Sequence, residues 1–206
     1  RSTRLVGVDH SELAIADARR RLKRLGLRNV TFRTAFFDPS FDAEVKPEQV
    51  EGVVYGQVLQ AGQGQIPSRQ AQIKAEIPRE VPSETVNKVC ASGMRTIGIA
   101  DQAVRAGDLN IAVTGGMESM SKAPYLLPGA RFGFRMGDVG AVDAMTHDGL
   151  TNPFTEKQMI NEASEVSNEL EITRPDMDRW AARSHQLAAK ATDDGRLAEE
   201  IVSVTV

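Results

Sequence analysis

The chain has 206 residues, 41% of them hydrophobic and 26% charged, and its formal net charge is -3. This is the composition of a folded globular protein with room for one large or two small domains, and the small negative charge argues against a nucleic-acid or anionic-membrane partner. One cysteine excludes an internal disulfide framework and a metal site of several thiolates, and since no apolar run is long enough to cross a bilayer, we expect a cytoplasmic protein.

The first elements in chain order are a strand, a helix and a second strand. Residues 5–9 are predicted to form a buried strand that ends in an acid, and Ser11 is placed to cap a helix over residues 12–25. Residues 29–33 are predicted to form the second strand. Residues 36–47 mix prolines, acids and aromatics without a period, which indicates a junction.

After the junction the alternation of strands and helices starts again. The predicted strands and helices are, in order, residues 53–55, 69–75, 85–89, 93–106 and 109–114. The helix over 93–106 is expected to bury Met94, Ile97, Ala100 and Val104. Strands that alternate with helices indicate an α/β sheet, and this is the predicted fold class.

The last third of the chain has a different texture. Residues 124–140 are rich in glycine, basic and aromatic residues, which predicts an extended loop. Thr173, with Asp176 three residues later, forms a capping-box pattern at the start of a long helix that Gly195 ends. A final strand is predicted at residues 201–206. The apolar residues that the long helix is expected to bury are Trp180, Leu187, Ala188 and Ala191.

The single cysteine lies where a predicted strand gives way to a helix, in the run VNKVCASGMR. Open α/β sheets bind ligands at the carboxyl ends of strands, and the N-terminus of a helix favours a thiolate over a thiol. Small residues follow Cys90, so a substrate carbonyl can approach the sulfur, and the Cys90 N–H can join an oxyanion hole. From the residues alone two alternatives stay open, a nucleophilic cysteine and a buried structural cysteine.

The surroundings of Cys90 resemble the signature of thiolases, the acetyl-CoA C-acyltransferases. The positions that carry the resemblance are Asn87, Cys90, Ala91, Ser92, Gly93, Met94, Thr96, Ile97 and Val104. Residues 48–78 are similar to the segment that precedes this signature in the family, and GGMESMSKAPYLLP (residues 115–128) to the segment that follows it. The runs MGD, DGL and DGRLAEEIVSV continue in the family's order.

This resemblance covers residues 47–206 and implies the N-terminal half of a thiolase. Residues 47–123 would form its α/β core with a mixed sheet, and residues 124–206 an incomplete part of its loop domain. The resemblance also implies a homo-oligomer, a dimer or a tetramer, in which the strand over residues 85–89 pairs with its copy across a two-fold axis.

The same resemblance implies the chemistry. Cys90 would take an acyl group from an acyl-CoA and pass it to a second one, or in reverse a 3-oxoacyl-CoA would be cleaved by CoA. Leu150 and Met159 fall where the family's loop domain contacts the pantetheine and the acyl group, although for Met159 an ordinary apolar contact is an open alternative. The CoA thioester is the substrate, and we expect no separate cofactor and no metal.

Two features depart from the family. The family's second half supplies a histidine base, a second catalytic cysteine and an asparagine, and none of those motifs occurs in this sequence, so we expect an incomplete and poor catalyst. His10, His147 and His185 have no Gly-His-Pro context and are expected to be surface or helix residues. Ile160 stands where the family has glycine after Met159, which adds a β-branched side chain at the expected CoA contact.

Residues 4–38 resemble instead a β-α-β piece of class I S-adenosylmethionine methyltransferases. In that family the acid that ends the strand, here Asp9, holds the ribose hydroxyls. The glycine-rich turn that must precede it is absent, so we expect no S-adenosylmethionine binding. We interpret residues 1–46 as a separate methyltransferase-like segment and junction, joined to the thiolase-like part near residues 41–47.

Three alternatives to a thiolase-type enzyme stand beside it. The first is a methyltransferase fragment, which lacks its glycine-rich turn. The second is a non-catalytic thiolase-like module that dimerises. The third is a serine hydrolase built on Ser92, whose flanks lack the Gly-x-Ser-x-Gly pattern of a nucleophile elbow.

Overall fold

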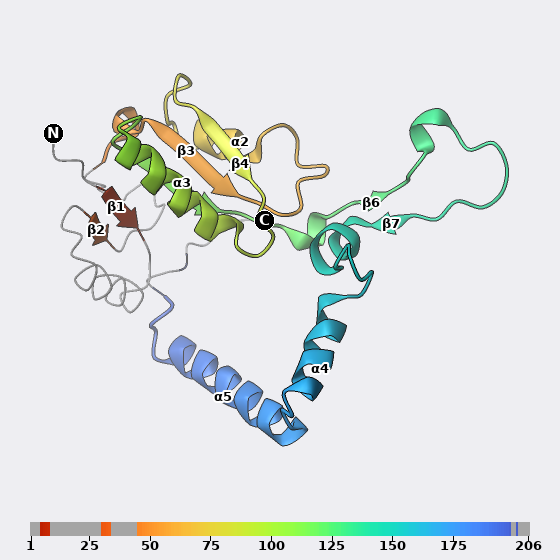
Figure 1. The fold of residues 1–206 in the computed structure, drawn as a ribbon. Helices are drawn as coiled ribbons and strands as arrows, with labels where there is room; N and C mark the ends of the chain where they lie inside the picture. The colour runs from red at the N-terminus through yellow and green to blue at the C-terminus, as the bar shows by residue number, and fades with distance from the viewer. Residues whose placement is uncertain (1–4, 9–29, 34–44, 199–200, 202–206) are drawn as a thin grey trace. The chain divides into compact units, whose positions relative to one another are not determined.

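The computed structural model describes residues 5–8, 30–33, 45–198 and 201 (Figure 1). The chain divides into two compact units, one of residues 45–162 and one of residues 1–44 with 163–206. The helix predicted over residues 12–25, Asp9, His10 and all but the first residue of the strand predicted at 201–206 lie outside the described residues.

Three parallel strands form the sheet of the unit that spans residues 45–162. They are β3 (Gly52–Gly56), β4 (Ser83–Val86) and β5 (Ala112–Gly116), in the spatial order β4-β3-β5. Val53 of the central strand is opposite Ser83 on one side and Val113 on the other. The predicted α/β class is confirmed, but the mixed sheet is wrong for the described residues, because a helix follows β3 and β4 and returns the chain to the same end of the sheet.

Two helices make the crossovers between these strands. Helix α2 (Pro67–Lys74) connects β3 to β4, and α3 (Ser92–Ala106) connects β4 to β5. Because β4 and β5 lie on opposite sides of β3, right-handed crossovers place the two helices on opposite faces of the sheet (Figure 1). A hydrophobic core fills the space on one of these faces, and its buried members are Val50, Val53, Ile77 and Val81.

Helix α3 turns a different face to the sheet from the one that its hydrophobic pattern predicts. Its buried residues recur every four positions and are Ser92, Thr96, Ala100 and Val104. Ala100 and Val104 are buried as predicted, whereas Met94 is 77% exposed and Ile97 is 54% exposed, so that part of the prediction was wrong. The reason is close approach: a Cβ at Gly56 would lie 2.4 Å from the carbonyl carbon of Ser92, and only small side chains fit such a contact.

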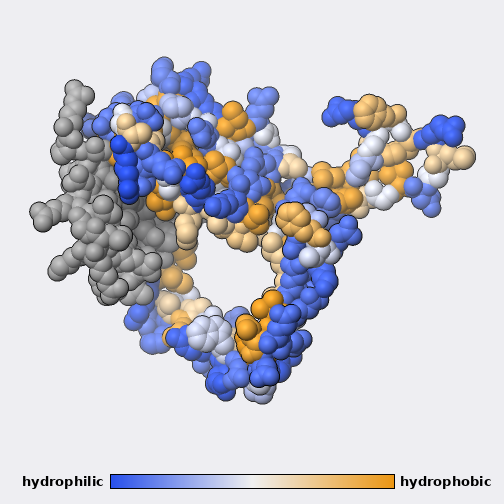
Figure 2. All heavy atoms as spheres, in the orientation of Figure 1, coloured by the Kyte–Doolittle hydropathy of each residue, from blue (hydrophilic) through white to orange (hydrophobic). Residues whose placement is uncertain are grey.

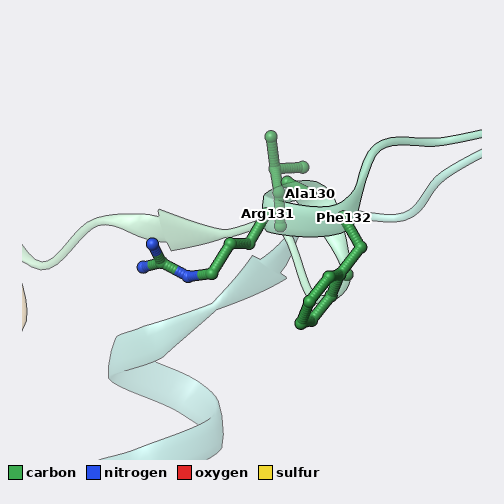
Figure 3. Close-up of a pocket in the computed structure, with 5 residues that line it drawn as sticks. Ala130, Arg131 and Phe132 are labelled. Carbon is green, nitrogen blue, oxygen red and sulfur yellow. The ribbon is translucent and has the colours of Figure 1, made fainter.

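An arm of residues 125–143 extends from this unit. Strand β6 (Tyr125–Leu126) pairs antiparallel with β7 (Val142–Asp143), and between them the chain forms only the 3-10 turn η3 (Ala130–Phe132). This agrees with the extended loop that was predicted over residues 124–140. Figure 2 shows apolar residues on the surface of this arm. A surface hollow at η3 is lined by Leu127, Gly129, Ala130, Arg131 and Phe132, and Arg131 and Phe132 point away from each other (Figure 3).

The remaining elements of this unit are short, and its end leads into α4. They are the 3-10 turns η1 (Pro47–Gln49) and η2 (Met120–Lys122), the π-helical turn η4 (Met145–Leu150) and the helix α4 (Met159–Glu169). The sequence analysis predicted none of these four elements: η1, η2 and η4 are single turns too short to stand out, and the amphipathic helix α4 was missed.

Strands β1 (Leu5–Val8) and β2 (Val30–Arg33) of the other unit pair in parallel. Both strands lie where the sequence predicts them.

Helix α5 (Arg174–Asp193) starts where the sequence predicts, at the cap residue Thr173. The backbone N–H of Asp176 donates to Thr173 Oγ1 over 3.3 Å, and Gly195 has the positive φ of a helix stop, at 74°. The predicted burial was wrong, because α5 has no buried residue and Trp180 is 69% exposed. Among the described residues, none of the helices combines the length and the hydropathy that a membrane span requires.

Candidate active site

The carboxyl ends of the three parallel strands are joined by backbone hydrogen bonds. The N–H of Met117, directly after β5, donates to Gly56 O at the end of β3 over 3.0 Å. The N–H of Gln57 donates to Val86 O at the end of β4, also over 3.0 Å. The loops after β3 and β4 leave toward opposite faces, so the topological switch point, where open α/β sheets bind ligands, lies at this edge.

The loop after β3 is held from β5 by a carboxylate. Glu118, two residues beyond β5, accepts the N–H of Val58 at Oε2 over 2.8 Å and the N–H of Leu59 at Oε1 over 3.3 Å. Hydrogen bonds to an ionised acceptor are about twice as strong as neutral ones. Glu118 therefore fixes the backbone of the β3 loop, defined here as residues 57–60.

The loop that carries the cysteine, residues 87–91, is fixed by Asn87. Its Nδ2 donates to Val58 O over 3.2 Å, and its Oδ1 accepts the N–H of Val89 over 2.9 Å. Val89 has a φ of 48°, a left-handed conformation that is an outlier for a β-branched residue. This conformation turns the chain sharply just before Cys90, and we call residues 87–91 the Cys90 loop.

Ser92 closes the Cys90 loop from the other side. Its side chain is buried, and its Oγ accepts the N–H of Lys88 over 2.8 Å and donates to Val89 O over 2.6 Å. A hydroxyl that is buried and committed to two backbone partners is a structural group. The geometry therefore argues against the serine hydrolase alternative built on Ser92.

Cys90 is a free and exposed thiol at this junction. The exposure contradicts the alternative of a buried structural cysteine. Helix α3 begins two residues later, and its N-cap residue Ala91 provides no side-chain hydrogen bond to the helix N-terminus. The N–H groups of Ala91 and Ser92 donate to Lys88 O and Val89 O over 3.1 and 3.0 Å, so this end of α3 acts on an anion at or near the sulfur through its partial positive charge.

The π-helical turn η4 packs directly on the β3 loop. A Cβ built at Gly149 would lie 3.4 Å from Leu59 Cδ2 and 3.9 Å from Val58 Cγ1, which are van der Waals distances, so the turn lies against the side chains of the β3 loop. Asn87 and the turn at Gly149 therefore both contact Val58. Single π-helical turns are rare and are frequent at functional sites.

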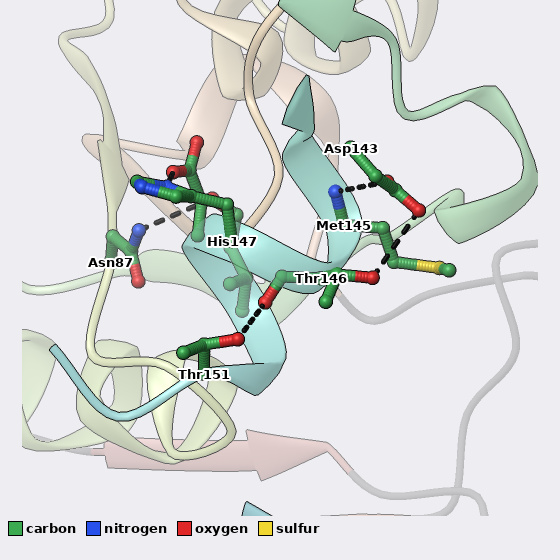
Figure 4. A network of polar contacts seen from close by, with 8 residues as sticks. Asn87, Asp143, Met145, Thr146, His147 and Thr151 are labelled. Carbon is green, nitrogen blue, oxygen red and sulfur yellow. Dashed lines mark hydrogen bonds and ion pairs between the residues drawn. The ribbon is translucent and has the colours of Figure 1, made fainter. Parts of the chain in front are cut away.

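Polar contacts hold η4 in this shape (Figure 4). The Asp143 carboxylate accepts the N–H of Met145 over 2.9 Å and the hydroxyl of Thr146 over 3.2 Å. The hydroxyl of Thr151 donates to Thr146 O over 2.8 Å. The turn is thus capped at both ends, which gives the residues at its surface fixed positions.

Leu150 and Met159, the predicted CoA contacts, lie at the two ends of one closed loop. Leu150 ends η4 and Met159 begins α4, and between them Thr151 and Gln158 form an antiparallel bridge. In an antiparallel register the next residues outward are Leu150 and Met159, so the bridge brings the two together. They are 39% and 42% exposed, which leaves apolar surface available to a ligand.

The two described histidines are surface residues, as the sequence predicts. His147 lies on η4, is exposed, and its Nδ1 is 2.6 Å from Asp148 Oδ1. His185 is exposed on α5. Within the described residues, no group of three or more histidine, cysteine, aspartate or glutamate side chains is arranged to hold a metal ion.

Sequence reasoning missed Glu118 as part of this site. The residue stands two positions after the glycine pair that ends β5, and its partners Val58 and Leu59 are 60 and 59 positions away in the chain. A carboxylate directly after a strand that ends in glycine is the available signal, because the carboxyl ends of parallel strands share one edge.

Comparisons with known proteins agree with this geometry. The family model described as "Thiolase, N-terminal domain" matches residues 39–206. An acetyl-CoA acetyltransferase of Cupriavidus necator is 49% identical over 164 residues, which are 80% of this chain and 42% of the relative. A probable acetyl-CoA acyltransferase of Staphylococcus aureus is 42% identical over 162 residues, 79% of this chain and 41% of the relative.

An acetyl-CoA acetyltransferase of Pseudomonas aeruginosa is 42% identical over 202 residues, which are 98% of this chain and 47% of the relative. That match extends into residues 1–38, which lie outside the family model. The matches give no support to the methyltransferase resemblance of that segment. The chain spans less than half the length of each of these relatives.

Proposed function

The chain belongs to the thiolase family, and from that premise we propose that it supplies the nucleophile of a thiolase-type acyltransferase, with Cys90 as the residue that is acylated. In the proposed half-reaction Cys90 Sγ attacks the carbonyl carbon of an acyl-CoA thioester. The bond between the acyl group and the CoA sulfur breaks, the acyl group stays on Cys90, and CoA leaves as the thiol with the proton. The reaction draws on no cofactor beyond the CoA thioester itself.

One observation carries this proposal. The single thiol is exposed on a sharply turned loop at the switch point of a parallel sheet, directly before a helix N-terminus. Such a position leaves the thiol open to a thioester, and it puts the partial positive charge of the helix N-terminus near the place where the thioester oxygen develops negative charge. The names of the relatives, acetyl-CoA acetyltransferase and acetyl-CoA acyltransferase, describe the same class of chemistry.

Leu150 and Met159 are proposed to contact the pantetheine and acyl parts of the thioester. Two observations support this proposal. The bridge that closes the loop between η4 and α4 brings the two residues together, and both are partly exposed. An apolar contact at this point orients the ligand along the edge of the sheet. Ile160, which departs from the family pattern, is 71% exposed.

The proposed function separates acylation from turnover. The described site supplies the residue that is acylated, so the proposal is limited to the acylation of Cys90 and does not include transfer of the acyl group to a second CoA thioester.

Self-association is proposed as part of this function. In the described sheet β4 is an edge strand, and it leads directly into the Cys90 loop. An edge strand offers unpaired N–H and C=O groups to another strand, and pairing with its own copy gives a two-fold symmetric dimer. The alternative of a non-catalytic dimerising module shares this surface and differs only in the absence of acylation.

The proposed chemistry is tested by incubating the chain with acetyl-CoA and locating the adduct by intact and peptide mass spectrometry. We expect one acetyl group on the peptide that contains Cys90, sensitive to hydroxylamine as a thioester is. Cys90→Ala removes the adduct, and Gln102→Ala, an exposed change on α3, leaves it. An adduct on another residue, or none in the wild-type chain, contradicts the proposal.

A further inference from the structure

Glu118 lies in an exposed loop, yet its carboxylate is bound to the backbone of another loop. Its carboxylate accepts two consecutive backbone N–H groups, those of Val58 and Leu59, from a segment about sixty residues earlier in the chain. The Val58 contact is 2.8 Å long, typical of a charge-assisted hydrogen bond. The carboxylate thus fixes the backbone of the β3 loop at the carboxyl edge of the sheet.

The carbonyl of the same peptide segment continues the connection. Val58 O accepts Asn87 Nδ2 over 3.2 Å, so the residue whose N–H is held by Glu118 presents its C=O to the Cys90 loop. Asn87 Oδ1 then accepts the N–H of Val89 over 2.9 Å. A continuous path of hydrogen bonds therefore runs from Glu118 to the residue directly before Cys90.

The path of hydrogen bonds ends at Val89, whose backbone conformation is strained. Its φ of 48° is unfavourable for a valine, and conformations of this kind persist only when the surrounding structure over-determines them. Three hydrogen bonds hold it: its N–H donates to Asn87 Oδ1, and its carbonyl accepts from Ser92 Oγ and from the Ser92 N–H. Loosening the first lets the backbone relax and changes the direction in which Cys90 leaves the turn.

We propose that Glu118 is a positioning residue for Cys90, acting through Val58 and Asn87 on the strained turn at Val89. This inference rests on the proposed function, in which Cys90 attacks a thioester. Glu118 itself touches neither the thiol nor the thioester in this role. Its effect is on the alignment of the sulfur, and displacements of about 1 Å in such alignments cost up to about a hundredfold in rate.

The chain contains a matched control for this carboxylate. Glu51 lies directly before β3, at the opposite edge of the sheet, and likewise accepts a backbone N–H from a residue 59 positions away, that of Asn110. Its Oε1 and Oε2 also accept Asn110 Nδ2. Glu51→Gln therefore removes a similar charged contact from the same unit without touching the path to Cys90.

The experiment measures single-turnover acylation of Cys90 by acetyl-CoA over a range of concentrations. Glu118→Gln is expected to lower the maximal acylation rate by about tenfold while the half-saturating acetyl-CoA concentration stays within about twofold of wild type. Glu51→Gln is expected to leave both unchanged. Equal maximal rates in wild type and Glu118→Gln, or equal losses in Glu118→Gln and Glu51→Gln, overturn the proposal.

A double-mutant cycle tests the path itself. If Glu118 acts through Asn87, the variant Glu118→Gln/Asn87→Ala is expected to acylate no more slowly than the slower of the two single variants. Multiplied rate losses would show independent roles and contradict the relay. Glu118→Asp keeps the charge with a shorter reach, is expected to acylate faster than Glu118→Gln, and serves as the test variant if the latter fails to fold by circular dichroism.

Failure of the proposed function has a different signature. If acetyl-CoA does not acylate even the wild-type chain, that function is wrong, and positioning is then decided by the rate at which iodoacetamide alkylates Cys90. Glu118→Gln is expected to change that rate by about threefold or more, because the sulfur moves relative to the N-terminus of α3, whereas Glu51→Gln leaves it unchanged. An unchanged alkylation rate in Glu118→Gln overturns the positioning role.

Discussion

Gly56 determines how closely α3 approaches the sheet. A Cβ at this position would lie 2.4 Å from the Ser92 carbonyl carbon and 2.5 Å from the Gly93 nitrogen, both backbone atoms that cannot rotate away. Gly116 on the neighbouring strand approaches the same turn, since its Cβ would lie 3.5 Å from Gly93 Cα. The glycine at the end of β3 is therefore required for the start of α3, and with it Cys90, to lie at the carboxyl ends of the strands, whereas Gly116 makes only van der Waals contact there.

Gly56→Ala is accordingly expected to destabilise the chain by about 3 kcal/mol, the upper range of overpacking in a core. Gly98→Ala is the matched control, because the new Cβ inside α3 would meet only the end of the Arg95 side chain at 3.5 Å. It is expected to stabilise by about 0.5–1 kcal/mol through helix propensity. Urea unfolding of both variants measures the difference, and a Gly56→Ala midpoint equal to wild type would falsify this account of the contact.

Glu51 joins the start of β3 to the segment before β5. The backbone N–H and the side-chain amide of Asn110 both donate to its carboxylate. The backbone hydrogen bond from Asn110, followed by the side-chain one, lowers the pKa of Glu51 below its ordinary value. The charged form of Glu51 therefore stabilises the folded state.

A group whose pKa is lowered by folding contributes its stabilisation above its unfolded pKa and loses it as the pH falls through the folded pKa. We expect wild type to exceed Glu51→Gln in thermal midpoint by a constant amount from pH 7 down to about pH 5, and this difference to shrink as the pH falls below about 4. Parallel melting of both proteins across this range checks the claim. A difference that stays the same at pH 3 as at pH 7 would mean that the charge of Glu51 has no role.

Most strands and helices of the sheet could be predicted because they carry a local signal, but the strand predicted over residues 85–89 was misplaced, since β4 is Ser83–Val86 and residues 87–89 lie in the Cys90 loop. Apolar runs between turn residues located β3 and β5, and the lone cysteine before small residues located the strand-to-helix junction. The face of α3 could not be predicted, because periodicity selects Met94 and Ile97 while the close contact at Gly56 requires the small side of the helix. Register and close approach are tertiary properties, and no window of sequence contains them.

The same limit applies to the site. Cys90 could be predicted as a site residue, because its residue type and its place before a helix can both be read from a short stretch of sequence. The connection from Glu118 through Val58 to Asn87 joins three loops that only the strand order β4-β3-β5 brings together. Hydrogen bonds between residues 29 and 60 positions apart depend on that order, so they could be found only in the structure.

At the scale of the whole molecule, the thiolase-like part presents one open sheet edge next to its candidate nucleophile. Strand β4 pairs with β3 on one side, and no strand among the described residues pairs with its other side. Exposed edge strands are sites of association unless charge or a bulge protects them. Glu84 is the one charged residue of β4, whereas Val86, its last residue, is half-buried and uncharged and leaves the end of the strand next to the Cys90 loop without such protection.

We therefore expect the chain to form a dimer or a larger species at micromolar concentration, with β4 antiparallel to its copy across a two-fold axis. Val86→Lys places like charges close to that axis and is expected to weaken association by about tenfold or more. Gln102→Lys adds the same charge on the exposed face of α3 and is expected to leave association unchanged, which separates local repulsion from a general effect of charge. Multi-angle light scattering after size-exclusion chromatography gives the mass of each variant, with circular dichroism to establish that each is folded. A wild-type chain that elutes as a monomer at all concentrations, or a Val86→Lys chain that associates as strongly as wild type, would exclude β4 as the interface.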